Sequence, residues 1–305
     1  MNLPLVCLLV LNWNGKELTK DCLRTLKITK YPNYKVLVID NGSQDGSVEY
    51  IKKHFPDVEV LELEKNYGFA GGMNRGIKYV LSKYSPKYIG LLNNDLEFFD
   101  KNWLLKVINV FKENERIGIV GCKLLYPDRT TIQHAYTSLI NNRIRIVGRL
   151  EKDRGQHDII KEVDISQFGC VLINTEVFKT IGYLDEVFLF SAEDCDFCIR
   201  AKKAGFKVFY CGTSNVIHKV SKTTVEKVNK LLRIFVTTKN ALIFHLRYFP
   251  LTTVFKELLI CLAKCMIERN EKRETTFNLY FPIRIVLVML AFFSAIIYKN
   301  YRIIK

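Results

Sequence analysis

Short apolar segments alternate with helical patterns through residues 1–122, and this alternation constrains the fold more than any other feature of the sequence. Five runs rich in Val, Ile and Leu predict buried strands at about 3–11, 35–39, 58–63, 87–92 and 117–122. Helical patterns lie between them, near 16–28, 45–54, 70–83 and 100–113. Strands that alternate with single helices predict βαβ units and a parallel sheet with helices on both faces. Ligands of such sheets bind beyond the carboxyl ends of the strands.

The loops that follow the first four predicted strands are unusually polar. They contain acids, amides and glycines, at 12–15, 40–47, 64–76 and 93–98. Asn-Gly and Asp-Gly in the second loop are turn signals, but turn formation explains four such loops in series poorly. The sequence has no GxxxxGK[ST] motif, and its glycines in 68–72 lack the GxGxxG spacing, so neither a P-loop nor a dinucleotide cofactor is expected.

Three acids gather in the stretch SAEDCDFCIR at 191–200, although the chain has a formal net charge of +15. Ser191 and Asp194 fit the spacing of a capping box ahead of a helical pattern. Acids in a first helical turn are stabilised by the helix dipole, and Gly205 stands where a C-terminal cap belongs. A structural role for these acids is therefore open beside a catalytic one.

Composition places the 305 residues, 49% hydrophobic and 25% charged, among globular proteins, with room for one sizeable α/β domain and an appendage. The nine cysteines are scattered, and Cys195 and Cys198 have no second pair at zinc-ribbon spacing. We therefore expect buried thiols in a reduced cytosolic compartment. The apolar start of the chain lacks a basic leading region and a small-residue cleavage site, so we expect a first buried strand and no signal peptide.

Six segments follow one another between residue 3 and about 224: VLNWNG, VIDNGSQDGS, NYGFAGGMNRGI, LLNNDLEF, GYLDEVFLFSAEDCDFCIRAKKAGF and VIHKVSKTT. In this order they resemble the motifs of the family 2 glycosyltransferases, and most of all the rhamnosyltransferase-like members. The resemblance implies a GT-A fold, which is an α/β fold with a Rossmann-like nucleotide-binding half and a mixed central sheet. It implies a catalytic domain over 1–222, with a nucleotide-sugar half (1–122) and an acceptor half (123–222). A basic, amphipathic helical region would follow over 223–305.

The resemblance further implies inverting transfer of a sugar from a nucleoside diphosphate to a hydroxyl of a glycan or lipid-linked acceptor, in surface polysaccharide synthesis. A dTDP-deoxyhexose such as dTDP-rhamnose is the favoured donor, with UDP-hexoses close behind. Asp194 matches the catalytic base, Glu193 would orient substrate hydroxyls, and Asp196 would be structural. The residues that match donor-binding positions are Asn12, Asn14, Asp40, Ser43, Asp45, Gly72, Asn74, Arg75 and Asn94.

Asn93-Asn94-Asp95 matches the D-x-D position of the family, with Asn in place of the first Asp. The resemblance leaves Asp95 as the main metal ligand, and His218 matches a histidine near the diphosphate or the metal. The implied cofactor is Mg²⁺ or Mn²⁺. Chemistry agrees, because a divalent cation bound by oxygen ligands neutralises the charge on a departing nucleoside diphosphate. Inversion also needs a carboxylate that accepts the proton of the attacking hydroxyl.

Two segments in the middle of the chain allow further predictions. Residues 123–168 are long, polar and weakly periodic, which suits an acceptor-side insertion or mobile lid as well as a solvated loop. Residues 168–178 predict a strand that runs into a helix. By family analogy, Gly169 and Cys170 in that strand would border the acceptor site.

Basic charge concentrates in the tail. Residues 216–305 contain 16 Lys and Arg against 5 Asp and Glu, or +11, and the first 215 residues contain 30 against 26, or +4. Residues 285–298 are 14 uncharged positions, too few for a perpendicular membrane span of about 20 residues. We therefore expect peripheral or monotopic attachment to an anionic membrane surface, at the cytoplasmic face of the cell membrane. A soluble helical appendage is the alternative.

Other functions remain as alternatives at this stage. One is a sugar-nucleotide-binding protein of the same fold without turnover, and another is a sugar-phosphate nucleotidyltransferase. The net charge also suggests a nucleic-acid binder. Because the basic residues form no recognised nucleic-acid-binding motif, we expect no nucleic-acid partner.

Overall fold

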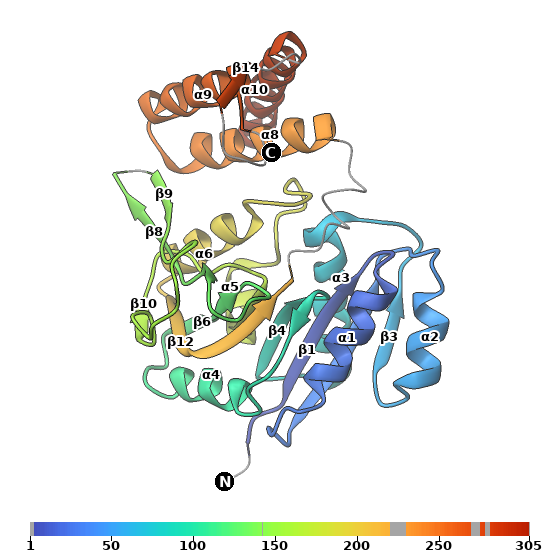
Figure 1. Cartoon of the computed structure of the whole chain (residues 1–305). Helices are drawn as coiled ribbons and strands as arrows, with labels where there is room; N and C mark the ends of the chain where they lie inside the picture. The colour runs from blue at the N-terminus through green and yellow to red at the C-terminus, as the bar shows by residue number, and fades with distance from the viewer. Residues whose placement is uncertain (1–2, 142, 220–229, 270–274, 278–280, 305) are drawn as a thin grey trace. The chain divides into compact units, whose positions relative to one another are not determined.

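The computed structural model describes residues 3–141, 143–219, 230–269, 275–277 and 281–304 (Figure 1). The chain divides into two units: the first comprises Met1–Leu189 and Glu193–Ser221, and the second Phe190–Ala192 and Lys222–Lys305. In the second unit, Asn240 Nδ2 donates hydrogen bonds to the carbonyls of Phe190 and Ser191, at 2.8 and 3.0 Å. These bonds tie the short segment 190–192 to a helix that lies about 50 residues further along the chain.

A mixed ten-stranded sheet forms the centre of the first unit. Its strands are β1 (Val6–Asn12), β2 (Tyr34–Asp40), β3 (Glu59–Glu62), β4 (Tyr88–Asn93), β5 (Leu96–Glu97), β6 (Ile117–Leu125), β7 (Ile132–His134), β10 (Ile160–Glu162), β11 (Cys170–Asn174) and β12 (Lys207–His218). The main order is β10-β12-β6-β11-β4-β1-β2-β3, with β5 paired to β12 and β7 to β6. Strands β1 to β4 are parallel neighbours, as predicted. In contrast, β11 is antiparallel to both β4 and β6 and separates them.

Helices cover both faces of this sheet, which confirms the prediction from the alternating pattern (Figure 1). They are α1 (Lys16–Leu26), α2 (Ser47–His54), α3 (Gly68–Tyr84), α4 (Trp103–Phe111), α5 (Thr175–Ile181) and α6 (Glu193–Lys203). Leu8 and Val10 of β1 belong to the core that α1 and α4 complete. Leu9, which points to the opposite face, lies against Gly76 of α3. Because both faces are buried, these strands have continuous apolar sequences.

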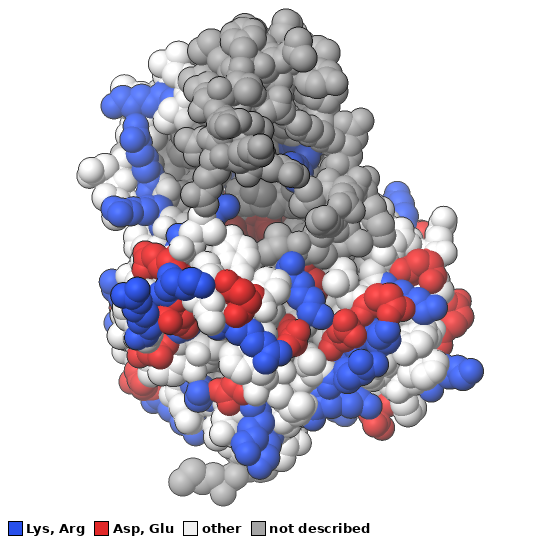
Figure 2. Space-filling view, in the orientation of Figure 1, with Lys and Arg blue, Asp and Glu red and all other residues white. Residues whose placement is uncertain are grey.

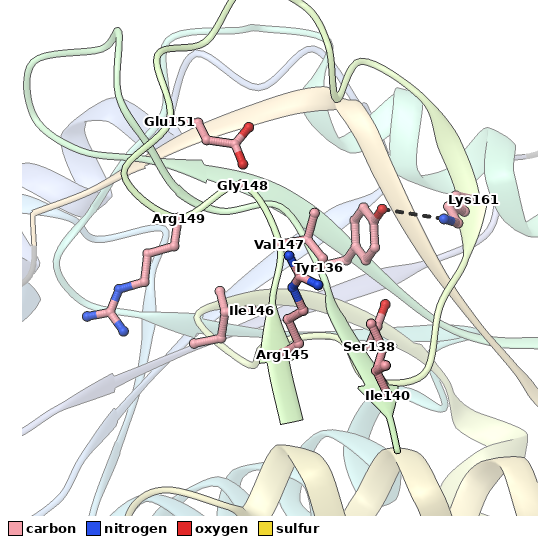
Figure 3. Close-up of a pocket in the computed structure, with 10 residues that line it drawn as sticks. All are labelled: Tyr136, Ser138, Ile140, Arg145, Ile146, Val147, Gly148, Arg149, Glu151 and Lys161. Atoms are coloured by element: carbon pink, nitrogen blue, oxygen red, sulfur yellow. Dashed lines mark hydrogen bonds between the residues drawn. The ribbon is translucent and has the colours of Figure 1, made fainter. Parts of the chain in front are cut away.

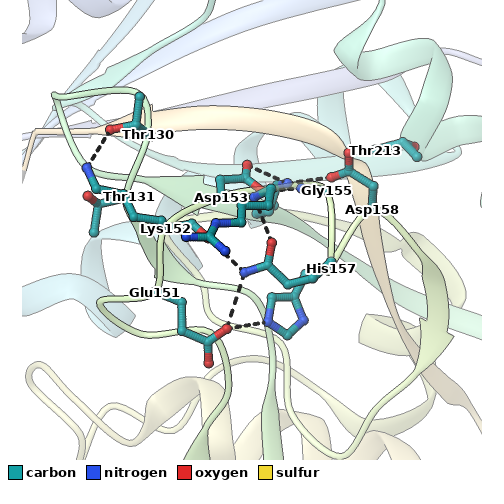
Figure 4. A network of polar contacts seen from close by, with 12 residues as sticks. Thr130, Thr131, Glu151, Lys152, Asp153, Gly155, His157, Asp158 and Thr213 are labelled. Atoms are coloured by element: carbon teal, nitrogen blue, oxygen red, sulfur yellow. Dashed lines mark hydrogen bonds and ion pairs between the residues drawn. The ribbon is translucent and has the colours of Figure 1, made fainter.

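Residues 123–168 contain regular structure, so the interpretation as a solvated loop is wrong. Within this segment β7 and β10 join the main sheet, and β8 (Thr137–Ile140) pairs with β9 (Arg143–Ile146) in a separate hairpin. The fully buried Lys123 of β6 forms ion pairs with Asp153 at 2.7 Å and Asp158 at 2.5 Å. Figure 4 shows these two acids in the polar network of the loop after β9. The interpretation as a mobile lid stays a prediction.

Strand β12 is longer than the sequence predicts. The apolar run SNVIH marks only its last five residues, whereas the strand begins at Lys207. An irregularity in its pairing with β6 falls between Cys211 and Asn215, where polar residues interrupt the apolar pattern. The segment 168–178 does form a strand followed by a helix, β11 and α5, as predicted. The seven cysteines whose side chains the structure describes are free and buried, as predicted.

Acidic and basic side chains are interspersed on the face of the first unit that Figure 2 shows. This distribution agrees with the balance of +4 in the first 215 residues. A large positive field would attract polyanions over a wide surface. The visible face of this unit instead has the mixed charge of an ordinary solvated surface.

The described part of the second unit consists of three helices and an antiparallel pair of short strands. They are α8 (Lys230–Tyr248), α9 (Leu251–Met266), β13 (Ile267–Arg269), β14 (Thr275–Phe277) and α10 (Phe281–Ile304). Pro250 lies between α8 and α9, where it interrupts the helical pattern because proline removes a backbone hydrogen bond. The apolar run 285–298 lies within α10. Among the helices of the described ranges, none is both long and apolar enough to cross a membrane.

Candidate active site

The carboxyl ends of β1, β2 and β4 meet where the strand order of the sheet reverses. β1 lies between β2 and β4, and an open α/β sheet binds its ligands at such a switch point. The register pairs Asn12 with Asp40 and Leu11 with Asn93. Polar residues that are far apart in the sequence therefore end three neighbouring strands at the same edge.

Asn12 is the centre of a buried hydrogen-bond network at this edge. Its Nδ2 donates to Asp40 Oδ1 at 2.8 Å and to Ser43 Oγ at 3.1 Å. Its Oδ1 accepts from Thr19 Oγ1 at 2.7 Å and from Asn94 Nδ2 at 3.3 Å. The side chain is completely buried and uses both ends of its amide within the protein, so a direct contact of Asn12 with the donor stays a prediction. Asn12 fixes the loops after β1, β2 and β4 to one another.

The loop after β2 is held against the loop after β1. Asp40 is buried, and its Oδ2 accepts a hydrogen bond from the Ser43 amide at 2.9 Å. Ser43 Oγ accepts from the Asn14 amide at 2.8 Å, and Asn14 Oδ1 accepts from the Gln44 amide at 2.7 Å. Asn14 has φ = 49°, a left-handed conformation that asparagine tolerates better than most residues. Ser43 and Asn14 both stay partly exposed.

Asp45 lies at the start of α1, although it belongs to the loop after β2. Its Oδ2 accepts from the Lys16 amide at 2.9 Å, at the first residue of the helix. A carboxylate at this place is stabilised by the positive end of the helix dipole. Burial alone would raise the pKa of Asp45, but hydrogen bonds from Ser47 and from the Lys16 amide outweigh it and lower the pKa below its ordinary value.

Two predicted donor-binding residues in α3 have positions that packing explains. A β-carbon at Gly72 would lie 2.7 Å from Leu11 Cδ1, so glycine is what allows α3 to approach β1 this closely. Asn74 is buried; its Nδ2 donates to the Leu184 carbonyl at 2.9 Å and to Glu186 Oε1 at 3.0 Å. The Leu184 amide donates back to Asn74 Oδ1 at 3.0 Å. Asn74 therefore holds the segment before the acidic motif against α3.

Arg75 is the more exposed neighbour of Asn74. Its guanidinium lies 3.5 Å from the centre of the Tyr67 ring and donates to the Gly71 carbonyl at 2.8 Å. Glu186 lies 3.6 Å away, in a partly exposed ion pair. With 34% of its side chain exposed, Arg75 presents a cationic group that a phosphate could reach.

Asn41 has a part in this region that the sequence did not reveal. Its side chain is buried; Nδ2 donates to Asn66 Oδ1 at 2.9 Å and to the Gly68 carbonyl at 3.0 Å. Its Oδ1 accepts from the Tyr67 amide at 3.0 Å. These bonds hold the start of α3 beside the end of β2. In the sequence, Asn41 stood only in an Asn-Gly pair that indicated a turn.

Asp95 and His218 lie together at the carboxyl edge of the sheet. His218 Nε2 is 3.1 Å from Asp95 Oδ1, and the side chains are only 12% and 7% exposed. The contact follows from strand pairing, because His218 ends β12 opposite Leu96 of β5, directly after Asp95. Asn93 Nδ2 also lies 3.2 Å from His218 Nε2. The structure thus brings together the two residues that the resemblance assigned to a metal.

Gln133 in β7 orients this histidine, and no sequence motif indicated this role. Its carbonyl oxygen Oε1 lies 2.5 Å from His218 Nδ1. Since this oxygen can only accept, Nδ1 carries a hydrogen. Nε2 is then the ring nitrogen that faces Asp95 Oδ1, and it could bind a cation after it releases any hydrogen that it donates there. His218 therefore offers Nε2 as a donor atom on the side of Asp95.

The donor atoms of Asp95 and His218 suit a divalent cation. Carboxylate oxygen is the usual protein ligand of Mg²⁺ and Mn²⁺, and imidazole is accepted by transition metals. Within the described ranges, no group of three or more His, Cys, Asp and Glu side chains is placed to hold a metal ion. A cation at this pair would therefore take its other ligands from phosphate oxygens and water, as Mg²⁺ often does.

The acidic motif occupies the first turn of α6. The helix begins at Glu193, so Ala192 precedes it where Ser191 was expected, and the predicted capping box is wrong. Ser191 and Ala192 have φ of 72° and 73°, in the left-handed region that is strained for residues other than glycine. Gly205 follows the helix with φ of 87°, which confirms the predicted C-terminal cap.

Glu193 and Asp194 form an adjacent pair of carboxyl groups with little access to water. Glu193 is buried, and its Oε2 has no hydrogen-bond partner among the side chains and backbone that the structure describes. Asp194 is partly buried, and its Oδ1 accepts from the Cys195 amide at 2.7 Å. Burial, and after it the charge of Asp194, raise the pKa of Glu193 to about 8; burial also raises the pKa of Asp194. Perturbed pairs of this kind are typical of proton-transfer sites.

Asp196 differs from its two neighbours. Its side chain is fully buried, and Arg200 Nε donates to its Oδ2 at 2.8 Å. The other nitrogens of Arg200 donate to the carbonyls of Ile181 and Tyr183, at 3.0 and 2.9 Å. This ion pair fits the structural role that was expected for Asp196.

Gly169 and Cys170 lie next to the strand end that leads to Asp95. The Gly169 carbonyl accepts a hydrogen bond from the Asn93 amide at 3.0 Å. The thiol of Cys170 is buried inside the sheet, 3.6 Å from Cys122 Sγ. Their place at the border of the acceptor site stays a prediction.

Known proteins share both the sequence motifs and the fold of this chain. The family model described as Glycosyl transferase family 2 matches residues 7–182. The chain is 26% identical over 182 residues to the low-salt glycan biosynthesis hexosyltransferase Agl10 of Haloferax volcanii; the match covers 60% of this chain and 58% of that protein. It is 24% identical over 248 residues to the dTDP-rhamnosyl transferase RfbF of Shigella flexneri, with 76% and 78% covered.

Among solved structures, the mannosyltransferase PcManGT of Pyrobaculum calidifontis, in complex with GDP-Man and Mn²⁺, is similar over 97% of this chain and 74% of that one, with a TM-score of 0.57. The sequence identity of 14% means that this likeness shows the fold alone. It agrees with the expected mixed α/β architecture around a mostly parallel sheet.

Proposed function

This chain belongs to glycosyl transferase family 2, and on that premise we propose that it transfers a sugar, with inversion, from a nucleoside diphosphate to an acceptor hydroxyl. The acceptor would be a glycan or a lipid-linked sugar of a surface polysaccharide. A dTDP-deoxyhexose or a UDP-hexose is the proposed donor, and the similarity to a dTDP-rhamnosyl transferase over three quarters of the chain supports the former. The observation that carries the proposal is that one unit holds both the Asp95–His218 pair and the Glu193–Asp194 pair.

The loops after β1, β2 and β4 would bind the donor. Exposure divides the predicted donor-binding residues into two groups, since only side chains that reach open space can contact a nucleotide. The buried side chains of Asn12, Asp40 and Asn74 would position these loops, and Gly72 would keep α3 close to β1. Direct donor contacts would come from the partly exposed residues, namely Asn14, Ser43, Asp45, Arg75 and Asn94.

Asp95 and His218 would hold a divalent metal, Mg²⁺ or Mn²⁺. Their oxygen and nitrogen donors and the tautomer set by Gln133 support this assignment. The mannosyltransferase of similar fold contains Mn²⁺. When bound, such a cation supplies positive charge beside the departing diphosphate. The protein would contribute by holding His218 Nδ1 on Gln133, so that Nε2 stays directed to the side of Asp95.

Asp194 would accept the proton of the attacking hydroxyl. Burial raises the pKa of both carboxyl groups, and it raises that of Glu193 to about 8, so that Glu193 retains its proton at neutral pH. A positioned general base contributes roughly 10²–10⁴-fold to the rate. Glu193 Oε2, which has no partner among the described residues, would bind a hydroxyl group of the acceptor or the donor.

The second unit would attach the enzyme to an anionic membrane surface. On α9, Leu251, Phe255 and Leu259 recur every fourth residue and are 58%, 56% and 64% exposed. A similar row lies on α10, formed by Val286, Leu290, Phe293 and Ile297. Apolar helix faces on a tail with a charge balance of +11 suit the interfacial region of an anionic leaflet. Attachment at the cytoplasmic face would bring the active site near a lipid-linked acceptor.

Product analysis with the purified protein tests this function. We expect incubation with labelled dTDP-rhamnose or a UDP-hexose, Mn²⁺ and a lipid-linked acceptor to yield a labelled glycoside and a nucleoside diphosphate. Formation of pyrophosphate and a new sugar nucleotide would identify a nucleotidyltransferase instead. Binding of the sugar nucleotide without turnover, across a panel of acceptors, would favour a non-catalytic binding protein.

A further inference from the structure

A cavity of about 370 Å³ lies beside the β8–β9 hairpin, and none of the residues assigned above lines it. Figure 3 shows its wall, with side chains from β8, from β9 and the loop that follows, and Lys161 from β10. Its volume is within the range of small-molecule sites, about 300–1,000 Å³. The polar groups that line it are mainly cations and hydroxyls: Tyr136, Ser138, Arg145, Arg149 and Lys161.

Cations outnumber acids in the wall of this cavity, where Arg145, Arg149 and Lys161 face one carboxylate, that of Glu151. The side chains of Arg145 and Arg149 form no hydrogen bond or ion pair with any residue in the described ranges. Glu151 is the only acid in the wall, and its carboxylate already accepts from His157 Nε2 at 3.0 Å and from Gln156 Nε2 at 3.3 Å. Guanidinium groups bind phosphate oxygens with two parallel hydrogen bonds. A ligand with two or more negative charges on phosphate groups would satisfy this cavity.

Tyr136 gives the cavity a fixed polar surface. Lys161 Nζ lies 4.9 Å from the centre of its ring and 3.4 Å from its hydroxyl oxygen. On the other side, the rings of Tyr210 and His157 lie 5.4 and 6.3 Å from it. The hydroxyl groups of Tyr136 and of Ser138 can donate hydrogen bonds to an anion, as can the lysine.

The same cavity has an apolar side that is open to solvent. Ile140 and Ile146 line it, although 45% and 40% of their surfaces are exposed. Ile144, between them on the hairpin, is 40% exposed. Exposed isoleucines beside unpaired arginines suit a ligand that carries an apolar chain next to its phosphates, because the chain would remove these side chains from water.

The hairpin that carries the cavity is bonded through Asp164 to the last turn of α6, and β7 precedes it along the chain. Leu139 of β8 donates its amide to Asp164 Oδ2 at 2.8 Å, and Asp164 Oδ1 accepts from Lys202 of α6 at 2.7 Å. α6 is the helix whose first turn contains the Glu193–Asp194 pair. Just before β8, Gln133 contacts His218. Figure 4 shows the polar contacts that hold the loop after β9, including Glu151 with His157.

The geometry points to a second anion site: this cavity binds the phosphate or diphosphate group of an acceptor whose carrier is an apolar chain. This assignment rests on the proposed function, because only that function makes the bound molecule an acceptor. It places the phosphorylated end of that molecule beside α6, the helix that begins with the Glu193–Asp194 pair. It adds a site for the carrier, whereas the donor phosphates bind at Asp95 and Arg75. Phosphate charge and chain would both contribute to the affinity.

Direct binding to the full-length protein tests this site without turnover. Geranyl diphosphate is the probe, titrated in buffer with EDTA so that metal-dependent donor binding does not contribute; inorganic pyrophosphate and geraniol test the two parts of the ligand separately. We expect Arg145→Ala and Arg149→Ala each to weaken geranyl diphosphate binding about tenfold or more, since each removes a charge-assisted contact. Arg143→Ala is the matched control: it is exposed on the same strand but does not line the cavity. The control should bind like the wild type.

Several outcomes would overturn the assignment. An equal loss in Arg143→Ala would mean diffuse attraction to the basic hairpin. If pyrophosphate binds as tightly as geranyl diphosphate, the apolar chain contributes nothing to binding at this site. Arg145→Ala and Arg149→Ala could also weaken binding to anionic phospholipid vesicles as much as they weaken binding of geranyl diphosphate. That result would identify the cavity as a contact with the membrane surface and not as an acceptor site. Binding of a nucleoside diphosphate with Mn²⁺, which should be unchanged in Arg145→Ala, tests the donor site separately; its absence in the wild type would count against the proposed function alone.

Discussion

Replacement of Gln133 by methionine tests whether His218 is a prepared metal ligand. Methionine has nearly the same length and fits β7, but it removes the oxygen that lies 2.5 Å from His218 Nδ1. A partly buried hydrogen bond of this kind contributes about 1–1.5 kcal/mol net, and about 1.4 kcal/mol is a factor of ten in an equilibrium constant. Without it, the imidazole no longer prefers the tautomer that keeps a lone pair on Nε2. We therefore expect Gln133→Met to weaken Mn²⁺ binding about tenfold, near the lower end of what such supporting residues contribute.

Calorimetric titration of Mn²⁺ in the presence of a nucleoside diphosphate measures this effect. Affinity for the free nucleoside should not change, because the side-chain hydrogen bonds of Gln133 go to His218. Gln156→Met is the matched control, since Gln156 lies in the same segment but bonds to Glu151 and the Lys152 carbonyl. His218→Ala shows how far Mn²⁺ affinity falls when the imidazole ligand is absent. Unchanged Mn²⁺ affinity in Gln133→Met, together with a large loss in His218→Ala, would refute the reasoning about the tautomer.

Four further predictions follow from the same contacts. Asp194→Asn should reduce kcat by at least about 10²-fold with little change in Tm, because an amide cannot accept the proton; near-normal turnover would exclude Asp194 as the base. The free energy of unfolding should fall as pH rises from about 4.5 to about 8 in the wild type but not in Glu193→Gln, because the folded protein keeps a proton on Glu193 that the unfolded chain releases; urea denaturation at several pH values shows whether the two profiles differ. Asn12→Ala should lower stability by about 3 kcal/mol, since it leaves several buried polar groups unpaired, and a urea midpoint close to that of the wild type would contradict this. Phe255→Ser combined with Leu259→Ser should reduce co-sedimentation with anionic vesicles while nucleotide binding persists; unchanged sedimentation would argue against α9 as the attachment face.

The fold of residues 1–122 could be predicted because its signals are local. A buried parallel strand is a short apolar run, and a helix between two such strands shows its own period, so each element is visible within about ten residues. The position of β11 has no such signal. Nothing in the run 170–174 shows that it inserts antiparallel between β4 and β6, because pairing between distant segments is decided by the whole core.

The candidate site shows the same division between local and distant information. Asp95, Glu193 and Asp194 could be proposed as site residues because each stands in a recognisable motif. The motifs could not show that Asn12 is buried and fully bonded, because burial depends on the loops after three strands. Gln133 was missed for a similar reason: it stands in a polar segment and contacts His218, 85 residues away, only through the pairing of β7 with β6.

The residues at the start of α6 combine features that lower the stability of the fold, and this combination supports a functional role for the acidic pair. Ser191 and Ala192 occupy the left-handed region in succession, at a cost of about 1–3 kcal/mol each. Directly after them, Glu193 buries an oxygen without a partner among the described residues. A helix start needs none of this, since a serine or aspartate cap would satisfy the first amide groups at no such cost. The carboxylates of Asp45, Asp164 and Asp196 show that the same chain pairs its other buried or partly buried acids. The strain and the unpaired carboxyl group therefore fit a turn that is shaped to hold two acids ready for a substrate hydroxyl.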